Sequence, residues 1–203
     1  MTLLPFSRAA ENNSAPIRDA LRHILPPQGS VLEIGSGTAQ HAVYFAGQLR
    51  GVRWQCSDLA GNLPGIQARI DCEGGGRLPD PIELDVLTSD WPQGPYDAVF
   101  TANTLHIMPW DNTLVLLDRV VKVLVPAGQL IIYGPFHDSG VHTAPSNAAF
   151  DQSLKLRDPA MGVRDAVEIT AQAARRGLHA QADLALPANN RILVFRKPDD
   201  APT

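Results

Sequence analysis

The stretch Val31-Leu32-Glu33-Ile34-Gly35-Ser36-Gly37-Thr38-Ala39-Gln40-His41 decides the fold of this chain. A short apolar run contains an acid near its end, two glycines follow one residue apart, and an amphipathic helical pattern comes next. This order predicts a strand, a tight turn and a helix N-terminus, because glycines let the backbone turn sharply and let a ligand approach closely. The carboxylate of Glu33 beside the turn favours a ligand that carries an ammonium or sulfonium group.

Strand and helix patterns alternate on both sides of this turn. Strands are expected at 30–34, 52–56, 81–84, 96–101, 129–133, 178–186 and 191–196, and helices at 14–25, 38–49, 62–71, 111–125 and 164–176. Such alternation predicts a parallel sheet with helices on both faces. The last two strands have no helix between them and should pair antiparallel. We therefore expect one α/β domain over residues 1–203, a doubly wound, Rossmann-like, mostly parallel seven-stranded sheet with an antiparallel C-terminal strand.

Two segments of the chain flank this predicted sheet. Residues 1–29 are expected to form an N-terminal helical cap, with Ser14 as the helix N-cap and Pro16 in the first helical turn. Residues 134–162 are polar and are expected to lack regular structure. A segment of this length without regular structure is typical of a lid or a substrate wall.

Polar residues fall at the carboxyl ends of successive predicted strands. Glu33 ends the first strand, Asp58 follows the second, Asp85 follows the third, and 101–106 follow the fourth. A doubly wound sheet binds its ligand at this edge, near the point where the strand order reverses. The sequence therefore predicts one ligand site that these residues share.

Two cofactor classes use this architecture, and the turn separates them. A dinucleotide needs Gly-x-Gly-x-x-Gly with its pyrophosphate on the helix N-terminus; here position 40 is Gln, and Glu33 would face the phosphates. S-adenosylmethionine has no phosphate and carries two cationic groups, which favours this cofactor. Asp58 would accept hydrogen bonds from the ribose hydroxyls and Asp85 from the adenine amino group. The alternatives are that Asp58 caps the next helix and that Asp85 is a solvated loop acid.

Composition limits the partners. The chain has 203 residues, 44% of them hydrophobic, and a formal net charge of −4. A negative net charge argues against binding nucleic acid over a broad surface, so no nucleic-acid partner is expected. No apolar run approaches the roughly 20 residues that span a bilayer, so no membrane partner is expected. Cys56 and Cys72 form no metal-like cluster and, with no secretory leader pattern at the start, predict a cytoplasmic protein.

At this point the sequence resembles the class I methyltransferases and, more closely, the small methyltransferase-like family known as domain of unknown function 938. The resemblance rests on Ser-Arg-Ala-Ala-Glu-Asn-Asn-Ser-Ala-Pro-Ile at 7–17, on 31–46, on Tyr-Asp-Ala-Val-Phe-Thr-Ala-Asn-Thr-Leu-His-Ile-Met-Pro-Trp at 96–110, on Gly134-Pro135-Phe136 and on 142–158. It implies the fold and an S-adenosylmethionine site, but no substrate. The candidate cofactor-binding residues are Glu33, Gly35, Ser36, Gly37, Asp58, Leu59, Asp85, Val86, Thr101 and Asn103.

The chain departs from the family at two positions. The family usually has Gly where this chain has Ala39, and the extra methyl group is expected to narrow the cofactor approach. The family usually has Arg-Asn where this chain has Asn12-Asn13. The missing cation puts the family's usual acceptor in doubt for this chain.

Methyl transfer is an in-line displacement, so positioning dominates and a base matters only where the acceptor carries a proton. His106 is the candidate base, with a hydrogen-bonded histidine that shapes its loop as the alternative. Asn103 is expected to orient the cofactor or the acceptor. No metal is expected, since the spacing of His137, Asp138 and His142 matches no standard site. The candidate substrate-binding residues are Asn13, His41, His106, Trp110, His142 and Arg157.

The leading hypothesis from these observations is S-adenosylmethionine-dependent methyl transfer to a small-molecule acceptor, by a monomer or a homodimer. One alternative is a protein that binds S-adenosylmethionine without methyl transfer, either regulatory or using the cofactor for a rearrangement or elimination. Another is a dinucleotide oxidoreductase, against which Glu33 and Gln40 argue.

Overall fold

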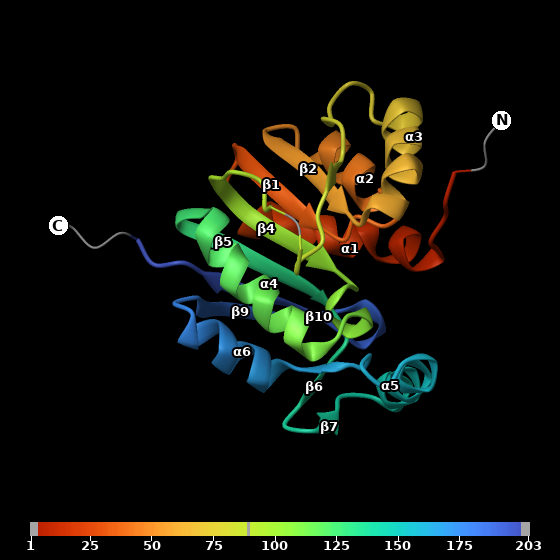
Figure 1. Cartoon of the computed structure of the whole chain (residues 1–203), viewed down its shortest axis with the longest axis vertical. Coiled ribbons are helices and arrows are strands. Elements are labelled where there is room, and N and C mark those ends of the chain that lie inside the picture. Colours follow the sequence, from red (N-terminus) through yellow and green to blue (C-terminus); the bar gives the residue numbers. More distant parts are fainter. Residues whose placement is uncertain (1–3, 89, 200–203) are drawn as a thin grey trace.

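The computed structural model describes residues 4–88 and 90–199 and centres on a seven-stranded sheet of order β3-β2-β1-β4-β5-β10-β9 (Figure 1). β10 runs antiparallel to both of its neighbours, and the other pairs are parallel, as the sequence predicts. The strands are β1 (Gly29–Ile34), β2 (Val52–Asp58), β3 (Ile82–Glu83), β4 (Tyr96–Ala102), β5 (Leu124–Gly134), β9 (His179–Leu186) and β10 (Asn190–Arg196).

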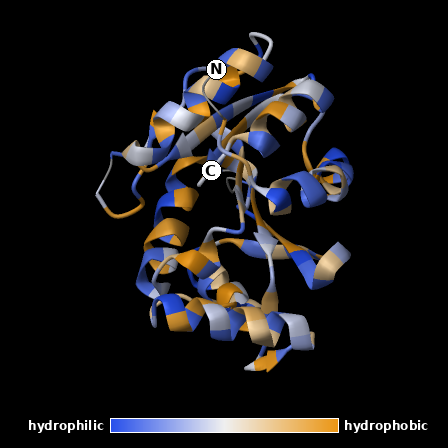
Figure 2. Cartoon of the chain, turned by 90° about the vertical axis from the view of Figure 1, so that its right-hand side faces the viewer, coloured by the Kyte–Doolittle hydropathy of each residue, from blue (hydrophilic) through white to orange (hydrophobic). Residues whose placement is uncertain are grey.

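Helices cover both faces of the sheet. α4 (Trp110–Val123) and α6 (Ala166–Arg175) lie in front of it in Figure 1, whereas α1 (Arg8–Ile24), α2 (Gln40–Gln48) and α3 (Leu63–Glu73) cover the opposite face. In β4, Val99 packs with the first group, and its neighbours Ala98 and Phe100 pack with the second. Both faces of the strand are thus buried, which explains its continuous apolar run. Figure 2 shows hydrophobic positions along the strands and a mixture along the helices.

The strand order reverses between β1 and β4. β1 pairs with β2 on one side and with β4 on the other, so that Ile34 lies beside Ser57 and beside Thr101. The carboxyl ends of β1, β2 and β4 therefore meet at one edge of the sheet, where a doubly wound fold opens its ligand crevice. At the opposite end of β4, the Asp97 carboxylate accepts hydrogen bonds from the Ser30 amide at 2.7 Å and hydroxyl at 3.0 Å, a structural role.

The first helix begins earlier than the sequence pattern suggests, so the prediction of Ser14 as an N-cap is wrong. α1 starts at Arg8, and the Ser7 hydroxyl accepts a hydrogen bond from the Ala10 amide. Ser14 lies inside the helix, where its hydroxyl donates to the Ala10 carbonyl at 2.5 Å. Pro16 is also internal. The helix tolerates it because burial of Ile17 and Leu21 against the sheet outweighs one missing backbone hydrogen bond.

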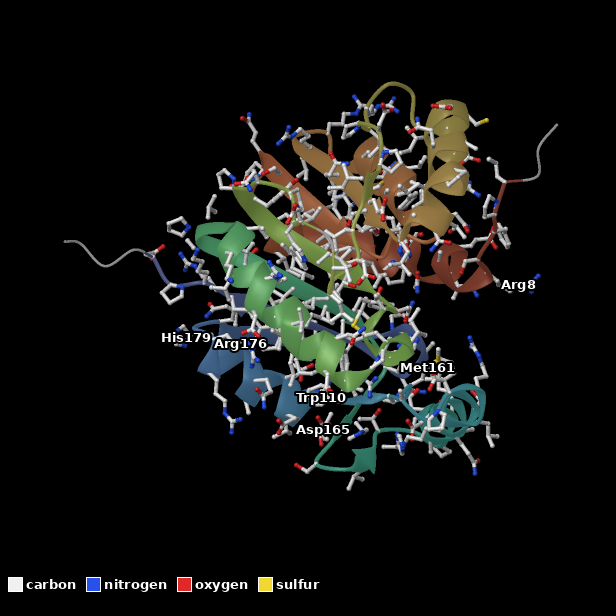
Figure 3. All side chains as sticks on the ribbon, in the orientation of Figure 1. Arg8, Trp110, Met161, Asp165, Arg176 and His179 are labelled. Carbon is white, nitrogen blue, oxygen red and sulfur yellow. The ribbon has the colours of Figure 1, made fainter. Side chains whose placement is uncertain are left out.

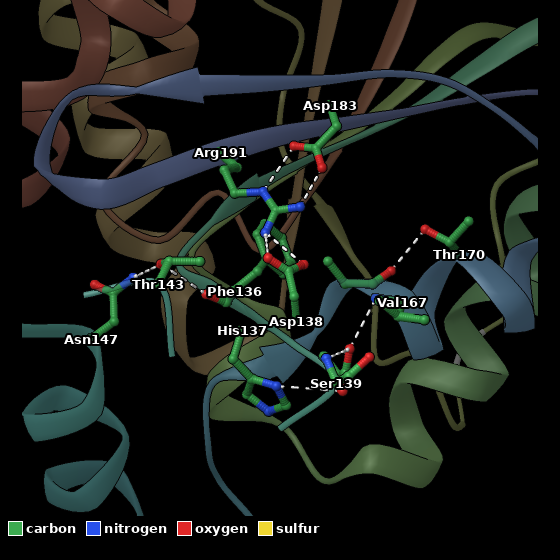
Figure 4. A network of polar contacts seen from close by, with 12 residues as sticks. Phe136, His137, Asp138, Ser139, Thr143, Asn147, Val167, Thr170, Asp183 and Arg191 are labelled. Carbon is green, nitrogen blue, oxygen red and sulfur yellow. Dashed lines mark hydrogen bonds and ion pairs between the residues drawn. The ribbon is translucent and has the colours of Figure 1, made fainter. Parts of the chain in front are cut away.

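The segment 134–162 is ordered into regular elements, contrary to the expectation of a structureless loop. It contains β6 (Phe136–Asp138), β7 (Val141–His142) and α5 (Pro145–Arg157), and β6 also pairs with β8 (Arg164–Asp165) to form a second, three-stranded sheet. Arg191 of β10 bonds both carboxylate oxygens of Asp138 at 2.9 Å and also contacts Asp183 (Figure 4). These ion pairs tie the segment to the main sheet.

Other element boundaries also lie a few residues from the predicted ones. α4 ends at Val123, so 124–125 belong to β5. α6 begins at Ala166, because the Asp165 carboxylate caps it by accepting from the Val167 amide at 2.9 Å. Three short 3-10 turns complete the described chain: η1 (Ala60–Asn62), η2 (Leu105–Ile107) and η3 (Pro187–Asn189). None of the helices in the described ranges combines the length and apolar character that a bilayer crossing requires.

Candidate active site

The turn after β1 is built on three left-handed residues. Gly35, Gly37 and Ala39 have φ angles of 74°, 57° and 57°. The amides of Gly35 and Ser36 both donate to the Ser57 carbonyl at 3.0 Å, which holds the turn against the end of β2. Ala39 adopts a conformation that costs an L residue roughly 1–2 kcal/mol and that glycine adopts freely.

The Ala39 side chain does not narrow the cofactor approach, so this expectation is wrong. Ala39 is completely buried in the hydrophobic cluster between α1, α2 and the sheet. Its methyl group therefore packs into the core, and the penalty of the departure from glycine lies in the backbone conformation alone.

Asp58 bridges the glycine turn and the segment after β2. One carboxylate oxygen accepts from the Gly37 amide at 2.6 Å. The other accepts from the Leu59 amide at 2.8 Å and from the Asn62 side chain at 2.7 Å. Asp58 therefore faces the turn directly, while Leu59 beside it leaves 54% of its surface exposed. Both residues stand where the sequence pattern expects a cofactor contact.

Glu33 is buried behind the turn. Its carboxylate accepts hydrogen bonds from the Ser36 hydroxyl at 2.8 Å and from the Trp54 indole N–H at 3.0 Å. Burial raises the pKa of Glu33 to about 7, although the two hydrogen bonds lower it; the charge of Asp58 raises it further. Loss of water around the carboxylate thus dominates, and a cation at this edge would supply the missing counter-charge.

The remaining predicted cofactor residues lie at the neighbouring strand ends, and their polar groups make different contacts within the protein. Asp85 follows β3, and its carboxylate accepts from the Leu87 amide at 2.9 Å, while Val86 is buried. The Thr101 hydroxyl donates to the Ile34 carbonyl at 3.0 Å. Thr101 thus joins β4 to β1 and has its hydroxyl engaged within the sheet.

The N-terminal segment is clamped over the glycine turn. The buried guanidinium of Arg69 donates to the Thr38 carbonyl at 2.7 Å and to the Pro5 carbonyl at 2.6 Å. Gln40, which replaces the third glycine of the dinucleotide pattern, accepts from the Ser7 amide at 2.6 Å. Gln40 therefore has a role that a glycine lacks, because it holds the start of α1 against the turn.

A cavity of about 790 Å³ lies beside this turn, between α1, α5, η3 and the ends of β4 and β5. This volume is within the range of sites for drug-sized ligands. The lining residues are Ser7, Ala9, Asn12, Asn13, Pro16, Asn103, His106, Tyr133, Pro135, Ser146, Asn147, Phe150, Pro187, Ala188, Asn189 and Asn190.

His106 and Asn103 converge at the floor of this cavity. A Cβ placed on Gly134 would lie 3.8 Å from Asn103 Oδ1 and 3.9 Å from His106 Nδ1. The absence of a side chain at Gly134 thus leaves space beside both polar atoms. Asn103 has a φ of 56°, which asparagine adopts more readily than most residues. The edge of the His106 ring meets Phe150 at a centroid distance of 5.1 Å.

The electrostatic environment keeps His106 neutral. Burial lowers the pKa of His106 to about 4, and the charges of Arg164 and Arg157 lower it further. Arg164 also fixes the turn that carries the histidine, since it donates to the Leu105 carbonyl at 2.9 Å and to the Met108 carbonyl. The imidazole is therefore positioned as an uncharged hydrogen-bonding group at neutral pH.

Asn13 and His41 are brought together at one wall. The His41 Nε2 donates to Asn13 Oδ1 at 2.6 Å, and the His41 ring stacks on Phe45. Burial lowers the pKa of His41 to about 4. Asn13 lines the cavity, whereas His41 supports it from behind. Burial raises the pKa of Tyr133, opposed by hydrogen bonds to the Asn13 and Asn190 side chains.

Besides His41, three predicted substrate residues lie outside the cavity lining. Trp110 begins α4 and packs against the core under that helix (Figure 3). The Nε2 of His142 on β7 is 3.4 Å from the Asp151 carboxylate, and Arg157 is exposed at the end of α5. Within the described ranges, no group of three or more His, Cys, Asp or Glu side chains is arranged to hold a metal ion.

Sequence reasoning missed several residues of the site. Arg69 gave no motif, because two of its partners are backbone carbonyls far away in the chain, and the third is Glu73, an ordinary i,i+4 ion pair on α3. Tyr133 looked like a strand core residue, and Asn189-Asn190 looked like a plain hairpin turn. The only signal was the recurrence of asparagine doublets at 12–13 and 189–190.

A family model described as "Protein of unknown function (DUF938)" matches residues 4–197. An O-methyltransferase family protein from Burkholderia thailandensis has a TM-score of 0.81 at 16% identity, over 95% of this chain and 58% of that one. The apo form of the S-adenosylmethionine-dependent methyltransferase SibL has a TM-score of 0.78 at 21% identity, over 93% and 55%. The SAH-bound form of CalO1, a methyltransferase in calicheamicin biosynthesis, has a TM-score of 0.74 at 19% identity, over 93% and 55%.

These similarities establish the class I methyltransferase fold for this chain. The chain spans little more than half the length of the three structures. At these identities the shared property is the arrangement of strands and helices.

Proposed function

The chain belongs to the DUF938 family, and we propose that it transfers a methyl group from S-adenosylmethionine to a small-molecule acceptor. One observation carries the proposal. The glycine turn, with Glu33 before it and Asp58 bound to its Gly37 amide, lies on one side of the carboxyl end of β4. The cavity that contains His106 lies on the other side. A donor and an acceptor bound at these two places would meet beside Asn103.

The residues around the turn fit the chemical groups of the cofactor. Glu33 is a buried carboxyl with no cationic hydrogen-bond partner among the described residues, so an ammonium group would relieve its desolvation. Asp58 presents two carboxylate oxygens at the β2 end, suited to a pair of ribose hydroxyls. The Asp85 carboxylate, Leu59, Val86 and the backbone at 35–37, 101 and 103 would complete the site. When bound, the cofactor supplies an electrophilic methyl group on a sulfonium.

The acceptor side positions the nucleophile. Asn103 Oδ1 and His106 Nδ1 both border the space over Gly134, where each can accept a hydrogen bond from an O–H or N–H group. Because His106 is neutral at pH 7, its imidazole can take the proton that an acceptor releases. Alignment of the acceptor by these two groups supplies the larger part of the rate enhancement.

α1 and the segment 134–162 would act as the cap and the acceptor wall of the site. Both elements line the cavity, through Asn12 and Asn13 on one side and Ser146, Asn147 and Phe150 on the other. We further propose a cytoplasmic protein, monomeric or homodimeric, that acts on a small molecule and uses no metal.

A second candidate function is cofactor binding without methyl transfer. The observation that favours it is the low pKa of His106, about 4, which makes its imidazole a weak base. The same cavity would then hold an effector.

The test uses the purified chain, S-adenosylmethionine labelled in its methyl group, and fractions of a small-molecule extract. We expect label to appear in a small-molecule fraction, and we expect His106→Gln to reduce this transfer at least tenfold while S-adenosylhomocysteine still binds. Cofactor binding without label transfer in any fraction would favour the second candidate. Failure of both binding and transfer would refute the proposal.

A further inference from the structure

The cavity lining carries an unusual set of side chains. Six of its sixteen residues are asparagines, contributed by α1, β10, α5, η3 and the segment after β4. Among the lining residues, none is Asp, Glu, Lys or Arg. A carboxamide offers two N–H donors and one carbonyl acceptor without a formal charge. The lining asparagines are Asn12, Asn13, Asn103, Asn147, Asn189 and Asn190.

Two of these carboxamides are held in place by hydroxyl and backbone groups. The Asn147 side chain donates to Thr143 Oγ1 at 3.2 Å and to the backbone carbonyl of Asn189 at 3.0 Å (Figure 4 shows the contact with Thr143). The Asn189 side chain donates to the Ser146 hydroxyl at 3.2 Å. These bonds join α5 to η3 and fix the direction in which the amides point.

Other polar atoms of the lining are left for a ligand. Within residues 4–88 and 90–199, the carboxamides of Asn12 and Asn103 make no side-chain hydrogen bond, and Asn147 Oδ1 accepts none. Asn147 is only 5% exposed. A ligand N–H at this point would find a carboxamide oxygen that no described residue occupies.

The two arginines that act on His106 are directed away from the cavity. The Arg164 guanidinium is engaged by the backbone carbonyls of Leu105, Met108 and Ala160. Arg157 is exposed and does not line the cavity. Both guanidiniums are close enough to lower the pKa of His106, but neither lines the cavity. An ionised ligand would therefore be desolvated there without a direct ion-pair partner, which is unfavourable. The apolar part of the lining, which includes Phe150 and three prolines, suits a flat ring.

We propose that this cavity binds an uncharged heterocycle that presents an N–H donor and a carbonyl or ring-nitrogen acceptor side by side, as lactams and nucleobases do. Carboxamides recognise such edges through paired donor and acceptor contacts. If the proposed function is correct, this heterocycle is the methyl acceptor. Its binding to the asparagines does not depend on the proposed function.

The test is saturation-transfer NMR on the full chain with four probes of similar size. 2-Quinolone and hypoxanthine carry the amide-type edge, 2-naphthol is neutral without it, and quinoline-2-carboxylate is an anion. We expect the first two to bind, 2-naphthol to bind more weakly, and the carboxylate to give no signal.

Two variants locate the contact. Asn12→Ala and Asn147→Ala should each weaken 2-quinolone about 2- to 10-fold, the equivalent of one hydrogen bond, and leave 2-naphthol unchanged. Asn112→Ala, an asparagine on α4 away from the cavity, is the matched control and should change neither. Because Asn12 is exposed and unbonded within the described chain, its variant should fold normally even if the Asn147 variant does not.

Preferential binding of the carboxylate, equal weakening of both neutral probes, or no binding of either amide-edged probe would overturn the inference. Calorimetry with S-adenosylhomocysteine on the same samples separates the two proposals. Asparagine-dependent binding of 2-quinolone with no S-adenosylhomocysteine binding would retain the cavity inference and refute the proposed function.

Discussion

Glu33 should make the stability of the protein fall as the pH rises from about 4.5 to about 7. Burial raises the pKa of Glu33 from 4.5 to about 7, so the folded chain holds this proton more tightly than the unfolded chain. Below pH 4.5 both states are protonated and no penalty exists. Above pH 7 both are ionised, and at about 1.4 kcal/mol per pKa unit the folded state is destabilised by on the order of 3 kcal/mol.

Glu33→Gln isolates this effect, because it keeps the side-chain shape and cannot ionise. Urea unfolding of both proteins from pH 4.5 to 8 gives the difference in their free energies of unfolding, in which His41, His106 and other titrating groups cancel. We expect the free energy of unfolding of the variant, relative to that of the wild type, to rise by roughly 3 kcal/mol from pH 4.5 to pH 8. Whatever Gln loses in bonds to Ser36 and Trp54 adds a constant offset. A difference that stays flat with pH would refute a buried, strained carboxyl at this position.

The same titration should govern the cofactor. An ammonium group near Glu33 favours the ionised carboxylate, so S-adenosylhomocysteine binding should release a proton near pH 6 and strengthen as the pH rises to 8. Calorimetry in two buffers of different ionisation enthalpy measures the released proton. In Glu33→Gln the release should vanish; equal release in both proteins would show that another group is responsible.

Three further predictions address the clamp, the cavity floor and the base. Arg69→Met removes the bonds to Pro5, Thr38 and Glu73 and should lower the free energy of unfolding by about 2–3 kcal/mol in urea. Arg18→Met, at a less buried arginine, is the control and should change this free energy far less. Gly134→Ala should leave folding and S-adenosylhomocysteine affinity intact yet raise the acceptor KM at least tenfold in steady-state kinetics; Gly47→Ala, which meets open space, should leave the KM unchanged. With saturating cofactor, kcat should stay constant from pH 8 to about 5, because the pKa of His106 is about 4. A decrease in kcat below about pH 6.5 would contradict a buried, neutral imidazole as the base.

The arrangement of the sheet was predictable because its determinants are local. Buried parallel strands give continuous apolar runs, as at 96–101 and 129–133, and helices between them force the parallel order. The absence of a helix between the last two strands predicted the antiparallel β10, which the structure confirms. The start of α1 was not predictable from Ser14, since Ser7 caps equally well and tertiary burial extends the helix.

The two halves of the site differ in how far the sequence reveals them. Glu33, Gly37 and Asp58 follow strand ends, so their meeting follows from the topology alone. The cavity depends instead on Asn147 and Asn189, whose meeting requires α5 to fold and dock on η3. No periodicity in 134–162 marks α5 as amphipathic, because few of its residues are buried. The burial of the Ala39 methyl group was likewise not predictable, because the direction of this group depends on the conformation of the whole turn.

The most direct test of the central claim is calorimetric titration of S-adenosylhomocysteine into the wild type and Asp58→Asn. We expect one site per chain in the wild type and a loss of affinity of about 10- to 100-fold in the variant, since hydrogen bonds to a charged group contribute roughly 1.5–3 kcal/mol. Asp71→Asn, on the exposed surface of α3, is the matched control and should bind as the wild type does. No binding to the wild type, or equal binding to the wild type and Asp58→Asn, would contradict a cofactor site at the ends of β1 and β2.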